Sequence, residues 1–368
     1  MSGPLSFRLC TAEDKPALVR FLDENWGSRH PLVHCEDYFT YYYESDAQDA
    51  LAECENSPGA ACGGFDGGAH AGLPSGSSRK KSAAPLQFAF AIEDGVLVAV
   101  AGYVWANRTP PRDLWVSIWC ARKGKNGAGL ELMDALPRLT GARVMACNNI
   151  RPKTMAFYTF LGYTAARLPH FYRLADRAHY QVALVPHKII LPAQGSAILT
   201  RIPDKQVLLR DFLPDASLRP AKDAWYLARR YFDFPRQHYD VYGVYEDSGK
   251  KIVALLVTRT VPVNGTQVLR IVDYVGAPER FASLGTALDG LMQAAKAEYA
   301  DCYCYGIPAA VFAAAGFAER AADDENIIPN YLTPPLYENT EYYFFTSDAD
   351  HFTLFKADGD QDRPNLTV

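Results

Sequence analysis

The chain has 368 residues, 49% of them hydrophobic and 21% charged, which is enough for two globular domains and unlike the composition of a disordered chain. Its formal net charge of -5 argues against nucleic acid or an anionic membrane as a partner, because both require clustered Lys and Arg. No apolar run approaches the roughly 20 residues that span a bilayer, and the start MSGPLSFRLC lacks the pattern of a signal peptide, so we expect a cytoplasmic protein with small-molecule partners.

The first part of the chain predicts a short strand and two helices. The strand covers Leu5–Cys10, and the first helix begins near Thr11, with Asp14 three residues on in the spacing of a capping box. The second helix is predicted over Glu36–Ala52. Residues 54–85 are rich in Gly, Ala, Ser and Pro and hold too few large apolar groups to offset the entropy of ordering. We interpret them as a flexible insertion.

The next segment predicts a hairpin followed by alternating strands and helices. Asp94-Gly95 joins two β-like runs, Gln87–Glu93 and Val96–Trp105, and this dipeptide favours a tight hairpin turn. A strand at Leu114–Ala121 then leads into a glycine-rich turn. The elements predicted after the turn are a helix at Gly127–Leu139, a strand at Arg143–Cys147, a helix ending at Leu161-Gly162, and strands at Leu168–Tyr172 and Tyr180–Val185. Strand, helix and strand in this order imply parallel pairing.

The second half of the chain repeats this order in fainter form. Its predicted elements are an aromatic-rich stretch at Trp225–Tyr239, a hairpin over Val241–Arg259 that turns at Asp247-Ser248-Gly249, a strand at Val268–Val275, a helix at Phe281–Tyr299, a strand at Cys302–Tyr305 and a short helix at Ala309–Ala315. We therefore interpret the halves as diverged copies. The predicted fold is α/β (an α+β mixed sheet), with domains at residues 1–186 and 187–368.

The glycine-rich turn has the features of an anion-binding loop. Gly127 and Gly129 permit close backbone approach, and the unpaired amides at the start of the following helix can hold a pyrophosphate. Arg122, Lys123 and Lys125 add positive charge beside it. The competing interpretation is a glycine turn with solvated basic residues and no ligand.

The order of elements around this turn, which closes in Phe157-Tyr158-Thr159-Phe160-Leu161-Gly162-Tyr163, resembles the GNAT N-acetyltransferase superfamily. In that family the helix ends in Tyr-x-x-x-Gly-Phe, and a loop Gln/Arg-x-x-Gly-x-Gly/Ala binds the pyrophosphate of CoA while the preceding strand pairs with the pantetheine arm. The resemblance implies that Gly127 and Gly129 take the two small positions and that Tyr158 protonates the departing thiolate. The chain departs from the pattern at Gly124, where the family has Gln or Arg, and at Arg151, where many members have Asn.

The resemblance covers residues 5–185 and implies an N-acyltransferase that uses acetyl-CoA, or another acyl-CoA, to acylate a small amine without a metal. The cofactor-binding residues it implies are Ile118, Trp119, Cys120, Arg122, Lys123, Gly124, Lys125, Asn126, Gly127, Ala128, Gly129 and Asn149. In the second half, Pro278 and Glu279 stand where the loop needs amide donors and neutral or basic groups. We therefore predict two GNAT-like domains in tandem, of which the second is degenerate and has lost CoA binding.

Acyl transfer also needs a proton acceptor, because the amine must be neutral to attack a thioester. The candidates are His30 and His34, which lie between the first two predicted helices, and Asp113, just before the strand. Local packing or capping is the competing interpretation of both histidines. Cys120 has no evident His partner, so a buried thiol is favoured over an acyl-enzyme. None of the eight cysteines forms a C-x-x-C pair, and we predict neither zinc nor a disulfide framework.

The C-terminal part is polar over Asp324–Tyr331 and again over 355–365. It resembles the tails of GNAT-like proteins from bacterial surface-polysaccharide clusters, which implies an amino sugar, free or nucleotide-linked, as the acceptor. The spacing of Asp358, Asp360 and Asp362 imitates an EF-hand loop but lacks its Gly and its bidentate Glu, so calcium is disfavoured. The aromatic residues of 225–239 fit sugar stacking or, more commonly, a core.

Two other functions remain open from the sequence. A tRNA-dependent aminoacyl transferase also uses paired GNAT-like domains, but the low basic content argues against it. A binding or scaffold protein with a decayed cofactor loop is the non-catalytic alternative, since a fold does not determine a function.

Overall fold

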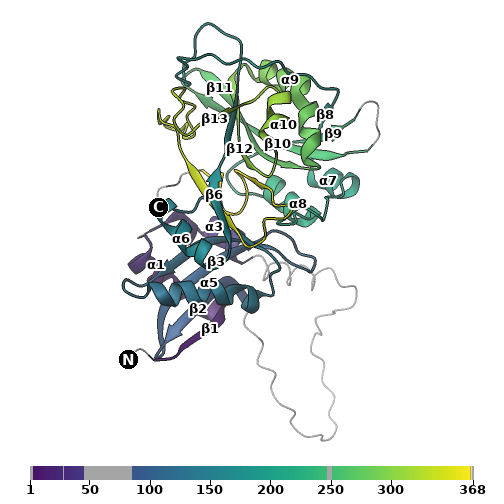
Figure 1. The fold of residues 1–368 in the computed structure, drawn as a ribbon. Coiled ribbons are helices and arrows are strands. Elements are labelled where there is room, and N and C mark those ends of the chain that lie inside the picture. Colours follow the sequence, from purple (N-terminus) through teal and green to yellow (C-terminus); the bar gives the residue numbers. More distant parts are fainter. Residues whose placement is uncertain (1–2, 28, 45–84, 247–250, 365, 367–368) are drawn as a thin grey trace, which may run out of the picture. The chain divides into compact units, whose positions relative to one another are not determined.

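A computed structural model describes residues 3–27, 29–44, 85–246, 251–364 and 366 (Figure 1). The chain forms two compact units: unit 1 comprises Met1–Gly102, Trp119–Leu132 and Thr367–Val368, and unit 2 comprises Tyr103–Ile118 and Met133–Leu366. The insertion predicted at 54–85 lies, up to residue 84, outside the described residues. The same holds for the predicted helix beyond residue 44 and for the predicted turn at 247–249.

Unit 1 is built around an antiparallel hairpin. Its elements are β1 (Leu5–Thr11), η1 (Ala12–Asp14), α1 (Lys15–Asn25), α2 (Pro31–His34), α3 (Glu36–Tyr43), β2 (Pro85–Glu93), most of β3 (Val96–Trp105), the end of β4 (Leu114–Ala121) and the start of α5 (Asn126–Thr140). The strand order is β1-β2-β3-β4. Asp94 and Gly95 have φ values of 49° and 78°, which confirms the predicted tight turn. The backbone N–H of Thr11 donates to Asp14 Oδ2 at 2.9 Å, so the predicted capping box is confirmed as well.

Unit 2 holds the remaining strands and helices. They are the start of β4, most of α5 (Asn126–Thr140), β5 (Met145–Asn148), η2 (Pro152–Thr154), α6 (Met155–Phe160), β6 (Thr164–Leu168), β7 (His170–Leu174), β8 (Ile198–Arg201), α7 (Lys205–Asp211), α8 (Ala224–Phe232), β9 (Asp240–Tyr245), β10 (Ala254–Val263), β11 (Thr266–Val275), η3 (Pro278–Leu284), α9 (Gly285–Ala295), β12 (Ala297–Tyr305), α10 (Ala309–Ala314), β13 (Ala318–Arg320), β14 (Tyr342–Thr346) and β15 (Leu354–Phe355). The fold is the predicted α/β arrangement with mixed sheets.

The strands of unit 2 show a reciprocal exchange between the two halves of the chain. One sheet runs β4-β5-β14-β6 and the other runs β8-β9-β10-β11-β12-β7-β13. β14 pairs antiparallel with β5 and β6, and β7 pairs antiparallel with β12 and β13. The yellow strand β14 accordingly lies beside β6 in Figure 1. Each half thus supplies one strand to the sheet formed mainly by the other, in the same place in the strand order.

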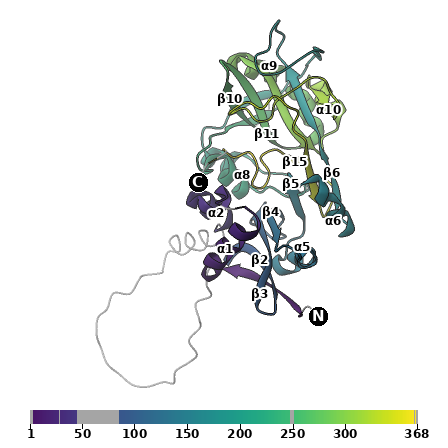
Figure 2. The same ribbon diagram turned by 90° about the vertical axis from the view of Figure 1, so that its left-hand side faces the viewer.

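Hydrophobic packing holds the second sheet together. α9 contacts β11 and β12 (Figure 2), and Phe281, Leu288, Phe312 and Phe317 are buried in one cluster with side chains of these strands. The rings of Phe281 and Phe312 lie 4.5 Å apart. In the aromatic stretch predicted at 225–239, Tyr226, Tyr231, Phe234 and Tyr239 are buried, which is the core interpretation of these residues.

Three predicted elements differ from the structure. Tyr180–Val185 forms no strand, and only Leu184 makes a β-bridge, to Ile327. The helix predicted to Tyr299 ends at Ala295, because Lys296 adopts a left-handed conformation with φ 53° and β12 begins at once. The strand predicted at Leu168–Tyr172 is two strands divided by Pro169, which has no N–H to donate.

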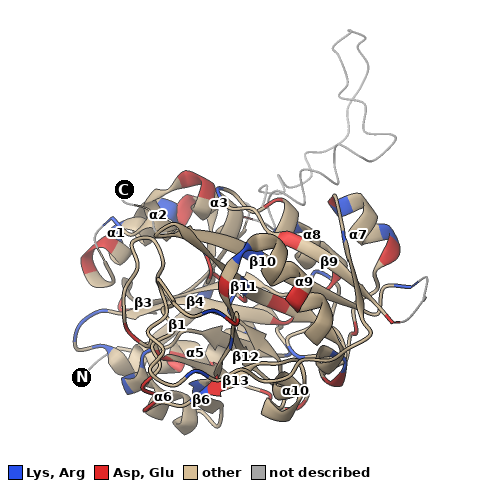
Figure 3. Ribbon diagram, turned by 90° about the horizontal axis from the view of Figure 1, so that it is seen from above, with Lys and Arg blue, Asp and Glu red and all other residues tan. Residues whose placement is uncertain are grey.

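The boundary predicted at 186/187 lies between β7 and β8, in a stretch without helix or strand, and remains a prediction. None of the helices within the described ranges is long and apolar enough to cross a membrane. α7 carries the basic residues Lys205 and Arg210 and ends at Asp211, and the ribbon in Figure 3 is coloured blue and red at such charged positions.

Candidate active site

Two parallel strands separate at the centre of the candidate site. β4 and β5 pair at Leu114 with Met145 and at Trp115 with Ala146. Their register extends no further, although both strands are described to their ends and β4 continues to Ala121. On its other edge, β5 remains paired with β14. Past Trp115, β4 and β5 therefore no longer pair with each other.

The glycine turn joins β4 to α5 in unit 1 and is fixed by backbone hydrogen bonds. The N–H of Arg122 donates to the carbonyl of Val98 at 2.8 Å, and the N–H of Lys125 donates to the carbonyl of Arg122 at 2.9 Å. Gly124 has φ 82°, a left-handed conformation that glycine adopts without steric cost. The resemblance leads us to expect Gln or Arg at this position, and the turn geometry gives a local reason for glycine.

The two glycines at the start of α5 have different surroundings. A Cβ placed on Gly127 meets nothing within 4 Å, whereas one on Gly129 lies 3.1 Å from the Cβ of Ala121. Gly129 therefore lets α5 pack closely on β4. Gly127 leaves open space beside the first amides of a helix that begins at Asn126, and such amides have no partner within the helix. This space suits an anion held by backbone N–H groups.

The side chains around the turn contribute positive charge and packing. Arg122 and Lys123 are exposed, and Lys125 pairs with Glu93 at 2.5 Å between Nζ and Oε2. Ile118, Cys120 and Ala128 are buried. The indole N–H of Trp119 donates to the carbonyl of Gly129 at 3.0 Å, which ties β4 to α5.

The remaining residues implied by the resemblance follow β5 in unit 2. Asn149 comes directly after the strand with φ 66°, and its amide donates to Gln361 Oε1 at 3.2 Å. Tyr158 lies on α6, is 3% exposed, and stacks on Phe345 of β14 with ring centroids 4.0 Å apart. Burial and the neighbouring Cys147 raise the pKa of Tyr158 well above its usual range. Its hydroxyl therefore keeps its proton at neutral pH, as a general acid requires.

Each of the three predicted proton acceptors contacts another residue of the chain. His30 Nδ1 accepts the N–H of Leu32 at 3.2 Å at the start of α2, and this contact assigns the proton of a neutral ring to Nε2. His34 Nε2 lies 2.7 Å from Asp23 Oδ1. The carboxylate of Asp113 is fully buried and bound by Arg143, at the opposite end of β4 from the glycine turn. The role of His30 or Asp113 as the base stays a prediction.

In the second half, the chain itself covers the equivalent of the glycine turn. The N–H of Ala197 donates to the carbonyl of Ser283 at 3.3 Å. A Cβ on Gly195 would lie 1.8 Å from the same carbonyl oxygen, and one on Gly285 would lie 2.5 Å from the carbonyl oxygen of Gln194. The segment before β8 thus packs directly against the start of α9, at the place where a pyrophosphate would otherwise bind.

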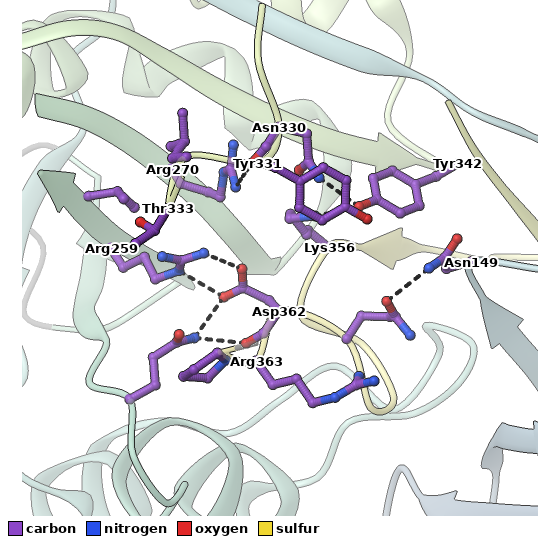
Figure 4. A pocket seen from close by; sticks show the side chains of 15 residues that line it. Asn149, Arg259, Arg270, Asn330, Tyr331, Thr333, Tyr342, Lys356, Asp362 and Arg363 are labelled. Atoms are coloured by element: carbon purple, nitrogen blue, oxygen red, sulfur yellow. Dashed lines mark hydrogen bonds and ion pairs between the residues drawn. The ribbon is translucent and has the colours of Figure 1, made fainter. Parts of the chain in front are cut away.

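A cavity of about 380 Å³ opens in unit 2 beside Asn149 (Figure 4). Its polar side chains include Arg259 on β10, Arg270 on β11, Tyr342 on β14 and Lys356 just after β15. The polar tail around Lys356 is visible in the sequence, but the sequence does not indicate that these residues share a cavity. Only the polar character of the tail indicates this site in the sequence, because a buried lysine has no distinctive sequence pattern.

The aspartates of the EF-hand-like spacing face cations of the chain. Asp358 Oδ1 lies 2.7 Å from Lys222 Nζ, and Asp362 Oδ1 lies 2.7 Å from Arg259 Nη2. Within the ranges that the structure describes, no group of three or more His, Cys, Asp and Glu side chains is arranged to hold a metal ion.

No protein-family model and no curated protein matches the chain. Among solved structures, a GCN5-related N-acetyltransferase from Anabaena variabilis is similar, with a TM-score of 0.47 and 10% identity over 93% of this chain and 72% of that one. A GCN5-related N-acetyltransferase from Kribbella flavida gives 0.42 and 14% over 93% and 70%. A tandem GNAT protein from the clavulanic acid biosynthesis pathway gives 0.33 and 16% over 71% and 82%. All three TM-scores are below 0.5, so these similarities carry no argument about function.

Proposed function

We propose that the chain is an acyl-CoA-dependent N-acyltransferase that acylates a small amine, with acetyl-CoA as the expected donor. The observation that carries this proposal is the separation of parallel strands β4 and β5 after two residue pairs. A glycine turn and the start of α5 follow the first strand, and the helix with buried Tyr158 follows the second. Each feature matches one requirement of acyl transfer from CoA: the diverging strand matches the pantetheine arm, the helix amides match the pyrophosphate, and Tyr158 matches the proton donor for the thiolate.

In the proposed reaction, a neutral amine attacks the thioester carbonyl of the acyl-CoA and forms a C–N bond. The C–S bond then breaks, and the CoA thiolate takes the hydroxyl proton of Tyr158. The extra proton on the nitrogen leaves to water or to a side-chain base, and Tyr158 regains a proton from water. Backbone groups of β4 would hold the pantetheine arm, and the amides of Gly127 and Ala128 would hold the pyrophosphate.

We further propose an amino sugar as the acceptor and a cytoplasmic location for the reaction. The acceptor proposal rests on the likeness of the polar C-terminal tail to those of polysaccharide-cluster proteins. It is supported by Lys356 and Asp362 of this tail, which line the cavity beside Asn149. The contacts of Gly195 and Gly285 further support a single CoA site per chain, in the first half.

Calorimetric titration with acetyl-CoA tests the donor site. Gly127→Val should weaken binding more than tenfold, a loss of over about 1.4 kcal/mol, because its side chain fills the space beside the helix amides. Gly290→Val is the matched control, since Gly290 also lies on a helix with nothing within 4 Å of its Cβ position, and it should bind like the wild type. Absence of binding in all three proteins would exclude the acyltransferase and leave the scaffold alternative.

A further inference from the structure

The cavity beside Asn149 gathers cationic side chains whose charges are unequally compensated (Figure 4). Arg259 binds Asp362 through two hydrogen bonds, of 2.7 and 3.0 Å. Arg270 binds Asp301 in the same way, at 2.7 and 2.9 Å. Each arginine therefore has a carboxylate of its own.

A third arginine of the lining, Arg363, lies 3.4 Å from Asp360 Oδ2. Lys356 is the fourth cationic side chain and has no such carboxylate. It is 8% exposed, and the one hydrogen bond that its ammonium makes among the described residues is a long one, 3.4 Å from Nζ to the hydroxyl of Tyr342. The ammonium also lies 4.5 Å from the ring centroid of Tyr342 and 5.2 Å from that of Tyr303. Aromatic faces attract a cation, but they do not neutralise it. A buried ammonium with only these contacts is incompletely compensated.

The charges around Lys356 leave this part of the cavity positive. Arg259 and Arg270 repel the ammonium from β10 and β11, while Asp301 on β12 and Asp362 in the tail attract it. Burial, reinforced by Arg270, lowers the pKa of Lys356 to about 7. Four cations (Arg259, Arg270, Arg363 and Lys356) against three carboxylates (Asp362, Asp301 and Asp360) leave room for one negative charge from a ligand.

A second observation points to a ligand in the same cavity. Asn330 lines it and is 3% exposed, and its amide Nδ2 donates to the hydroxyl of Tyr342 at 2.7 Å. Its Oδ1 is buried without a hydrogen-bond partner, which is costly for a carbonyl oxygen. A ligand with an N–H or O–H group would satisfy this acceptor.

The backbone of Lys356 is fixed to the proposed acyl-transfer site. Asn148, the last residue of β5, donates from Nδ2 to the carbonyls of Phe355 and Lys356, at 3.0 and 3.2 Å. Asn149, the next residue along the chain, lines the cavity. The cavity therefore adjoins the end of β5, just past the place where β4 and β5 separate.

We propose that this cavity binds an anionic group of the acceptor, a phosphate or a carboxylate, with Lys356 as its counter-ion and Asn330 Oδ1 as acceptor for a neighbouring N–H or O–H. The assignment to the acceptor rests on the proposed function. Binding of the anion itself does not depend on it.

Sulfate is a suitable probe, because it keeps its charge between pH 6 and pH 8.5 while Lys356 loses its proton. The titrations use the Gly127→Val protein as background, so that the glycine turn does not compete for the anion. Sulfate should bind at least about tenfold more weakly at pH 8.5 than at pH 6, since the ammonium form is the one that attracts an anion. Acetate, titrated in parallel, distinguishes a carboxylate site from a phosphate site.

Variants at Lys356 give the decisive comparison. Lys356→Met should weaken sulfate binding at pH 6 by tenfold or more, whereas Lys356→Arg should keep it and lose the pH dependence. Lys188→Met, which removes an exposed lysine paired with Asp176, should bind sulfate like its parent. Thermal denaturation establishes that each variant is folded.

Equal sulfate affinity in Lys356→Met and its parent would overturn the anion site, as would equal affinity at both pH values or no binding of either anion. If acetyl-CoA fails to bind while sulfate binding depends on Lys356, the proposed function is wrong and the anion site stands. If acetyl-CoA binds and neither anion does, the anion site is wrong and the proposed function stands.

Discussion

The ion pair between Asp113 and Arg143 provides a quantitative test of how unit 2 is stabilised. Arg143 donates to the two carboxylate oxygens at 2.9 and 2.6 Å, and the N–H of Ala221 donates to Asp113 Oδ2 at 2.7 Å. The side chain of Asp113 is fully buried and that of Arg143 is 31% exposed. Arg143→Met would therefore leave a buried carboxylate with the backbone donor of Ala221 but without the guanidinium of Arg143.

The expected cost follows from this geometry. Removing one partner of a buried pair costs about 3–5 kcal/mol. Water reaches the exposed part of Arg143, and Ala221 still donates to the carboxylate, so we expect a loss of about 2–3 kcal/mol in the free energy of unfolding. Urea denaturation followed by tryptophan fluorescence measures it, because buried Trp115 lies two residues from Asp113.

Arg138→Met is the matched control. Arg138 pairs with Asp134 at 3.4 Å one helical turn away, and the two side chains are 75% and 66% exposed. Its loss should change the free energy of unfolding by less than about 0.5 kcal/mol. Equal small losses in Arg138→Met and Arg143→Met would refute the reasoning, since burial is the property that distinguishes the two pairs.

Two further predictions concern the proposed proton donor and the second half. Tyr158→Phe should keep the stacking on Phe345 and the affinity for acetyl-CoA but lower kcat at least about a hundredfold. Tyr163→Phe is the control, because its ring stacks on the same Phe345, and it should leave kcat unchanged. Equal kcat values in the two variants would exclude Tyr158 as the acid. In α9, Gly285→Ala should lower the melting temperature, because the added Cβ meets the backbone of the segment before β8. Gly290→Ala should raise the free energy of unfolding by about 0.5–1 kcal/mol, because Ala favours a helix over Gly. Melting temperatures that shift in the same direction in both variants would contradict the contact at Gly285.

Features decided by neighbouring residues could be predicted from the sequence. The Asp94-Gly95 turn and the capping box of Thr11 and Asp14 depend on a few adjacent residues, and both are present. The predicted strand Leu114–Ala121 agrees with β4 at both ends, because its apolar run stops at the glycine turn. Local side-chain chemistry and backbone preference were sufficient in these cases.

Features decided by distant partners could not be predicted. The residues of β14 carry the apolar pattern of a strand, but nothing near them in the sequence identifies β5 and β6 as their neighbours. The site divides in the same way. The glycine turn is a local motif, whereas the environment of Lys356 is formed by side chains from β10, β11, β12 and β14.

The strand exchange gives a physical reason why the second half would be retained even with its own glycine turn covered. β14 from the second half pairs with β5 and β6, and its Phe345 stacks on Tyr158. The tail that follows β14 supplies Lys356, which Asn148 fixes beside β5. Removing the second half would therefore expose the edges of two strands and remove the ring against which Tyr158 packs. Under the proposed function, catalysis by the first half depends on a strand and a tail that only the second half provides.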